Sequence, residues 1–141
     1  MTKPMPIGAL AVETGVKVPT IRYYESVGLL PAADRTDSNR RVYGPKDVRR
    51  LRFIRHAREL GFEVEAIRQL LSLADQPDRP CREADMIART HLSDIDHKIA
   101  RLVALRSEVR RMVDQCAHGR ISECRVIEVL ADHAECLHDA H

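Results

Sequence analysis

Four cysteines are the residues whose type and spacing could do chemistry. They are Cys81, Cys116, Cys124 and Cys136, and all lie in the second half of a 141-residue chain. In a reducing cytosol, thiols more often bind metals or take part in redox chemistry than form structural disulfides. The stretch "CAHGRISEC", from Cys116 to Cys124, also holds His118 between its thiols. Thiolate and imidazole ligands suit Zn(II), Cd(II), Hg(II) and Pb(II), whereas Mg(II) and Ca(II) prefer oxygen.

A long heptad pattern precedes this stretch. No proline or glycine interrupts residues 81–118, and apolar or thiol side chains recur there at alternating spacings of four and three residues, with one exception. The positions are Ala88, Leu92, Ile95, Ile99, Leu102, Arg106, Val109, Val113 and Cys116. The pattern predicts one long helix with a narrow apolar seam. Arg106 is the exception, and we interpret it as a residue that fixes the register of the paired helices. We expect this helix to dimerise; the alternative is that it folds back onto its own domain.

The length of that helix decides which thiols can share an ion. Cys81 and Cys116 are 35 residues apart, which is about 50 Å of helix, so they cannot meet within one chain. In an antiparallel dimer, Cys81 of one chain would lie beside Cys116 and Cys124 of the other. Each thiol could instead be a small buried apolar group. Whether Cys136 and the histidines of the last residues also bind metal is left open; those histidines are His133, His138 and His141.

Charge is divided unevenly along the chain. Residues 1–75 carry 13 Lys and Arg against 9 Asp and Glu, whereas residues 76–141 carry 10 against 12. A basic first half indicates an anionic partner, although arginine-rich helices are common in such compositions. The hydrophobic share of 44% and the charged share of 31% are typical of a soluble globular protein.

Several classes of protein are not expected. No apolar run approaches the roughly 20 residues of a membrane-spanning helix, and "MTKPMPIGALAV" is not typical of a signal peptide, so we expect a cytoplasmic protein without a membrane partner. The chain shows no nucleophile and base at recognisable spacing and no phosphate-binding loop, so we do not expect an enzyme.

Glycine and proline divide the first half into short elements. A helix from about Ile7 to Thr14, and a second that starts at Pro19 and ends before Gly28, predict a helix-turn-helix. The polar stretch "DRTDSNRRVYG" predicts a tight loop between short strands, a candidate wing. A third helix should start at Pro45, and a fourth should run from Val64 to about Ala74. The third is expected to bury Val48, Leu51, Ile54 and Phe53.

Two motifs resemble those of the MerR family of bacterial transcription regulators. They are "TIRYYESVGLL" and "RRVYGPKDVRRLRFIRHARELGF". The resemblance implies a mainly α protein, with a winged helix-turn-helix and a long antiparallel coiled-coil helix in a homodimer. It further implies binding to double-stranded promoter DNA whose −35 and −10 elements are unusually far apart. In the family, effector binding distorts that DNA so that RNA polymerase can use it. The domains would be residues 1–75 for DNA binding, 76–118 for hinge and dimerisation, and 119–141 for the metal-binding loop and tail.

The expected DNA contacts lie on three elements. Arg22 can meet bases or phosphates in the major groove, and arginines of the wing can grip phosphates or remain a solvated loop. The expected set is Thr20, Arg22 and Tyr23 on the second helix, Arg40, Arg41 and Tyr43 in the wing, and Lys46 and Arg49 on the third helix. Tyr24 is interpreted as core. In the family the wing usually reads Gly-Tyr-Arg-x-Tyr, and here Arg40 replaces the aromatic residue.

The resemblance also bears on the metal. Sensors of monovalent ions in the family have a serine where divalent-metal sensors have a cysteine, and this chain has Cys81 there, which implies a divalent ion. The expected ligands are therefore Cys81 of one chain with Cys116, Cys124 and His118 of the other. Two alternatives stay open: a copper(I) sensor that uses only Cys116 and Cys124, and a thiol-redox switch without metal. The four clustered cysteines of the family's iron–sulfur redox sensors are absent.

Overall fold

The computed structural model describes residues 4–116 and 118–132. By its internal contacts the chain divides into two compact units, Met1–Ala88 and Arg89–His141, and the boundary falls within a long helix. Within the described residues, all regular structure is helical except one two-stranded hairpin, which confirms the mainly α fold. No helix in that part of the chain is both long and apolar enough to cross a membrane.

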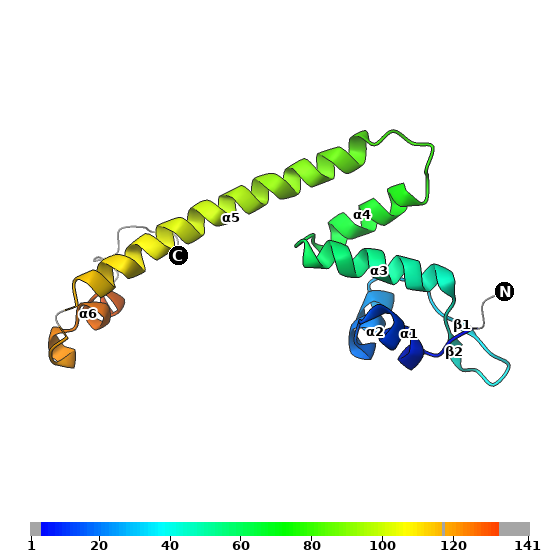
Figure 1. Ribbon diagram of the computed structural model, residues 1–141, viewed down its shortest axis with the longest axis horizontal. Helices are drawn as coiled ribbons and strands as arrows, with labels where there is room; N and C mark the ends of the chain where they lie inside the picture. The colour runs from blue at the N-terminus through cyan, green and yellow to red at the C-terminus, as the bar shows by residue number, and fades with distance from the viewer. Residues whose placement is uncertain (1–3, 117, 133–141) are drawn as a thin grey trace. The chain divides into compact units, whose positions relative to one another are not determined.

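Two short helices form the predicted helix-turn-helix (Figure 1). The first, α1 (Ile7–Thr14), ends at Gly15, which adopts the left-handed conformation (φ 73°) and donates its N–H to the Ala11 carbonyl oxygen. The second, α2 (Val18–Ser26), has a proline in its first turn, where a missing N–H leaves no helical carbonyl unsatisfied. Leu10 of α1 and Ile21 of α2 are fully buried, so both helices face one core.

The predicted wing is a short antiparallel hairpin. Strands β1 (Asp34–Arg35) and β2 (Arg41–Val42) pair with Asp34 opposite Val42 and Arg35 opposite Arg41. Asn39 in the connecting turn has a left-handed φ of 63°, which asparagine tolerates better than most residues. The residue after β2, Tyr43, forms an isolated bridge with Met5, which fixes the base of the wing.

Two longer helices complete the first unit. Helix α3 (Pro45–Glu59) starts with proline, and the Asp47 carboxylate accepts a hydrogen bond of 2.9 Å from the Gly44 N–H just before it. Helix α4 (Val64–Ala74) buries Ile67 and Leu71 against α3. The fully buried side chains of the core are Leu10, Ile21, Leu29, Leu30, Tyr43, Leu51, Ile54 and Ile67.

One core prediction for α3 is wrong. The side chain of Phe53 is 38% exposed, whereas Val48, Leu51 and Ile54 are buried as expected. Successive residues of an α-helix point about 100° apart, so Phe53 lies at the edge of the stripe that contains Ile54.

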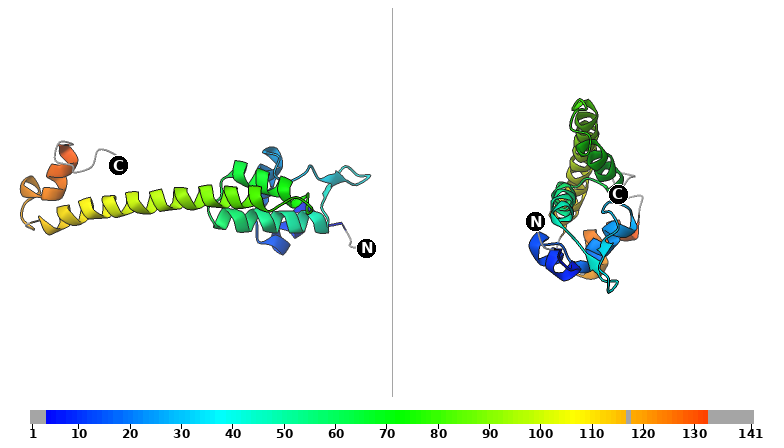
Figure 2. Two further views of the ribbon diagram at one scale, coloured as in Figure 1. Left: turned by 90° about the horizontal axis from the view of Figure 1, so that it is seen from above. Right: turned by 90° about the vertical axis from the view of Figure 1, so that its right-hand side faces the viewer.

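The long helix predicted by the heptad pattern is present. Helix α5 (Arg82–Asp114) runs for 33 residues, without a break, as Figure 2 shows. It ends two residues before Cys116, whereas the pattern predicted that Cys116 would close it. Five of its seam side chains are more than half exposed in the single chain, and they are Leu92, Ile99, Leu102, Val109 and Val113.

The segment after α5 folds further than the sequence indicates. Expected to be a loop, it contains a 3-10 helix (Ile121–Glu123) and a short helix, α6 (Arg125–Ala131), whose Val129 is buried. Arg125 Nε donates a 2.8 Å hydrogen bond to Gln115 Oε1, which ties the start of α6 to the turn after α5. The candidate ligands His133, Cys136, His138 and His141 lie outside the described residues.

Candidate nucleic-acid interface and candidate metal centre

Two of the predicted metal-binding thiols lie next to one another. Cys116 follows α5 and Cys124 is the N-cap residue of α6; both are half-buried, and neither forms a disulfide. The Ile127 backbone N–H in the first turn of α6 lowers the pKa of Cys124; partial burial opposes this, and the Val126 N–H and the Cys116 thiol lower it further. Because the thiolate is the form that binds metals, this environment favours a metal ligand at Cys124.

The other predicted ligands are exposed. Cys81 lies directly before α5, and its carbonyl oxygen accepts a 2.9 Å hydrogen bond from the Asp85 N–H. His118 lies in the turn between the two paired thiols with a left-handed φ of 56°. Within residues 4–116 and 118–132, no group of three or more His, Cys, Asp or Glu side chains has the arrangement of a metal site. The site of three thiolates stays a prediction.

The exposed face of α2 carries the residues predicted to read DNA. Ile21 and Tyr24 point into the core, where Tyr24 was expected, and are 0% and 7% exposed. Their burial turns the residues between them, Arg22 and Tyr23, outward; the Tyr23 side chain is 51% exposed. Thr20 is half-buried at the start of the same helix. This face offers a guanidinium and a phenol to a groove.

The wing residues differ in what they offer to a partner. Arg40 and Arg41 are exposed, and Arg41 Nη1 lies 3.3 Å from Glu25 Oε2 on α2. The Tyr43 side chain, predicted to contact DNA, is 1% exposed, and its hydroxyl donates a hydrogen bond to Glu25 Oε1. Burial first, and then the bond to Glu25, raise the pKa of Tyr43 to about 12. Because its side chain is buried, Tyr43 is better placed to hold the wing in position than to contact DNA directly.

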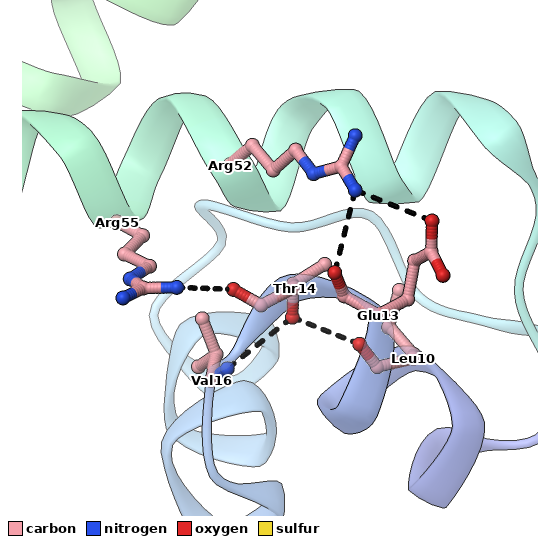
Figure 3. A network of polar contacts seen from close by, with 6 residues as sticks. All are labelled: Leu10, Glu13, Thr14, Val16, Arg52 and Arg55. Carbon is pink, nitrogen blue, oxygen red and sulfur yellow. Dashed lines mark hydrogen bonds and ion pairs between the residues drawn. The ribbon is translucent and has the colours of Figure 1, made fainter.

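Several arginines of the first unit hold the fold together. Figure 3 shows Arg52 and Arg55 of α3 reaching the end of α1. Arg55 Nη1 donates a 2.7 Å hydrogen bond to the Thr14 carbonyl oxygen, and Arg52 Nη2 binds the Glu13 carbonyl and carboxylate oxygens at 3.3 and 3.2 Å. Helix ends leave carbonyl oxygens without helical partners, so these guanidinium groups stabilise the C-terminus of α1.

Arginine side chains also bind backbone carbonyl oxygens in the segment after α2. Arg68 of α4 binds the Val27 carbonyl oxygen at 2.6 Å, and Arg50 of α3 binds the Leu29 carbonyl oxygen at 2.8 Å. Sequence reasoning missed the role of these arginines within the fold, because the carbonyl oxygens they bind are distant in the chain and leave no local pattern. It also missed Glu25, for which the available signal was an acidic residue on the helix predicted to contact DNA.

Other cations of the first unit have side chains that are unbonded within the described residues. Arg22, Arg40, Lys46 and Arg49 are exposed, and within the described part of the chain their side chains form no hydrogen bond or ion pair. All four were predicted to contact DNA. They lie on α2, the wing and the first turns of α3, and each keeps its charge and its N–H donors for a partner such as phosphate.

Family models match most of the chain. A model described as "MerR HTH family regulatory protein" matches residues 5–74, and one described as "MerR, DNA binding" matches residues 48–112. A curated relative from Rhizobium meliloti (strain 1021), named heavy metal-dependent transcription regulator 2, is 37% identical over 91% of this chain and 87% of its own length.

Two solved structures share both fold and sequence with the chain. The transcription regulator PbrR691 from Ralstonia metallidurans CH34, in complex with lead(II), is 35% identical, with a TM-score of 0.81 over 89% of this chain and 98% of that one. The regulator MerR from Bacillus megaterium MB1, in complex with mercury(II), is 32% identical, with a TM-score of 0.66 over 91% of this chain and 100% of that one.

Proposed function

Since the chain belongs to the MerR family of helix-turn-helix transcription regulators, we propose that it is a homodimeric activator that responds to a divalent soft metal ion. Relatives named for heavy metals, lead(II) and mercury(II) support the metal response. The observation that carries it is the pair formed by Cys116 and Cys124, with the pKa of Cys124 lowered toward the thiolate.

Promoter DNA is the proposed partner of the first unit. The unbonded cations on α2, the wing and α3 supply phosphate contacts and base readout, whereas the arginines bound to carbonyl oxygens are already used within the fold. From the resemblance, we propose a promoter with a long spacer between its −35 and −10 elements and RNA polymerase as the second partner.

The proposed metal site is shared between two chains. A 33-residue helix is about 50 Å long, so Cys81 at one end of α5 needs a second, antiparallel chain to approach Cys116 and Cys124 at the other. The exposed apolar side chains of α5 supply the surface on which that second chain packs. Three thiolates, with His118 as a further ligand, would hold Zn(II), Cd(II), Hg(II) or Pb(II).

Such a site would couple metal binding to DNA geometry. The segment that carries Cys116 and Cys124 belongs to one chain, and Cys81 lies between α4 and α5 of the other, next to its DNA-binding domain. Drawing these residues together changes the hinge between α4 and α5, so the two DNA-binding domains take a new relative position and distort the promoter.

Transcription assays test this function. A duplex is first selected from a random library by the wild-type protein, placed in a long-spacer promoter, and transcribed with Zn, Cd, Hg, Pb and Cu salts. We expect activation by a divalent ion, and we expect Cys81→Ser to keep its affinity for the selected duplex while it loses that activation. A serine variant that responds normally to every metal would contradict the shared site, and activation by copper(I) alone would favour a site of two thiolates.

A further inference from the structure

Glu25 is an acidic residue on a helix proposed to face a polyanion. It lies on α2, three residues after Arg22, and its side chain is only 12% exposed. One carboxylate oxygen accepts the hydrogen bond from the Tyr43 hydroxyl, and the other pairs with Arg41 at 3.3 Å. Because negative charge near phosphate opposes binding, the position of Glu25 calls for a compensating role.

We propose that Glu25 is a positioning residue of the DNA interface, which holds the guanidinium of Arg41 in the wing in register with the recognition helix α2. This inference rests on the proposed DNA-binding function. It adds a residue that does not itself contact DNA, and it assigns the wing hairpin and α2 to one rigid recognition surface.

The backbone at the base of the wing supports this role. Tyr43 exchanges two backbone hydrogen bonds with Met5, of 2.7 and 2.8 Å, so its position is fixed independently of Glu25. Arg41 and Tyr43 are two residues apart, and alternate residues of an extended strand point to the same face. Both side chains therefore reach Glu25, which ties the wing to α2 at two points.

The geometry leaves Arg41 able to bind a second anion. Its side chain remains 46% exposed while Nη1 pairs with Glu25. A guanidinium has five N–H donors, so one edge can stay on the carboxylate while another meets a phosphate. The side chain of the neighbouring Arg40 is exposed and forms no hydrogen bond or ion pair within the described residues. Glu25 thus orders Arg41, and not the neighbouring Arg40, before DNA arrives.

If Glu25 orders the long Arg41 side chain before DNA binds, loss of Glu25 should lower the affinity for DNA. We expect Glu25→Gln to weaken binding to the selected duplex by about three- to tenfold, because an unheld Arg41 must be ordered on binding. Glu25→Asp keeps the charge but retracts the carboxylate, so it should share the loss. The control is Glu13→Gln, which removes the same charge and breaks the Arg52 pair on α1, and should bind within about twofold of wild type.

A double-mutant cycle with Arg41→Ala isolates the route by which Glu25 acts. If it acts through Arg41, adding Glu25→Gln to Arg41→Ala costs no further affinity. Tyrosinate absorbance gives an independent signature of the contact, since Glu25→Gln should lower the pKa of Tyr43 from about 12 while burial still keeps it raised.

The outcomes separate this inference from the function beneath it. The inference is overturned if Glu25→Gln binds as tightly as wild type or tighter, or if it loses the same factor in the Arg41→Ala background. If Arg41→Ala weakens DNA binding and Glu25→Gln does not, the proposed DNA interface stands and only the role of Glu25 is wrong. If wild type selects no duplex, or if neither Arg22→Ala nor Arg41→Ala weakens binding, the DNA interface itself is wrong.

Discussion

At the scale of single residues, the Arg55 side chain occupies space that is open only because residue 15 is glycine. Gly15 has φ of 73°, and a Cβ added there would lie 2.3 Å from Arg55 Nη1, the atom that binds the Thr14 carbonyl oxygen. Any side chain at Gly15 therefore strains the backbone and displaces the guanidinium that stabilises the end of α1.

We predict that Gly15→Ala lowers the free energy of unfolding by about 2–3 kcal/mol, from left-handed backbone strain and the lost hydrogen bond. Urea denaturation measures this. In an Arg55→Ala background the same change should cost less, since only the backbone strain remains. Gly8→Ala is the control: no atom lies within 4 Å of the added methyl, and the helix should be unharmed or gain up to about 1 kcal/mol.

Tyr43 gives a prediction about pH. Its pKa is raised to about 12, from an ordinary value near 10, by burial and by the bond to Glu25. The folded state therefore holds this proton more tightly than the unfolded state, and that contribution to stability is complete below pH 10 and is lost as pH rises toward 12. Tyrosinate absorbance should show one tyrosine titrating near 12, and Tyr43→Phe should abolish that step. A Tyr43→Phe titration identical to wild type in its last step would contradict the assignment.

The basic residues show what the sequence could predict at this scale. The excess of positive charge in residues 1–75 predicts an anionic partner, and the structure exposes Arg22, Arg40, Lys46 and Arg49, as such a partner would require. The count of charges cannot tell which arginines bind carbonyl oxygens within the fold. Arg55 and Arg68 do so with partners 41 residues away in the chain, which only tertiary structure brings near.

At the scale of elements, α5 is the helix whose apolar seam is exposed in the single chain. Leu102 and Ile99 are 64% and 53% exposed on its seam. Apolar side chains at heptad spacing are normally buried against a second helix, which removes them from water.

We predict that Leu102→Glu converts the dimer into a monomer, because it places a charge in the apolar seam without a partner. Analytical ultracentrifugation measures the mass. Ala100→Glu adds the same charge on an exposed position of α5 outside the seam and should remain dimeric. If both variants sediment like wild type, the seam is not the dimer interface.

Helices α5 and α6 show why one element was predicted and the other missed. Helix α5 has many heptad positions without an interrupting glycine or proline, so its pattern is unambiguous. Helix α6 has seven residues, too few for a periodic pattern to stand out, and much of its order comes from contacts such as Arg125 with Gln115.

At the scale of the whole molecule, Cys81 precedes α5 in the chain, and Cys116 and Cys124 follow it. The sequence predicted that Cys116 and Cys124 act together, and the structure places them side by side. Cys81 belongs to the predicted site only if a second chain supplies it, since about 50 Å of helix separates the ends of α5. The proposed regulator is thus complete only as a dimer.

A heterodimer of two defective chains tests this sharing most directly. Cys81→Ser and Cys116→Ser chains, carrying different affinity tags, are mixed, and the heterodimer is purified and titrated with cadmium(II) against a competing chelator. The account predicts one tightly bound ion per heterodimer and none in either variant homodimer, because Cys81 of the second chain and the Cys116–Cys124 pair of the first form one intact site. A heterodimer that binds no more cadmium than the variant homodimers would contradict it.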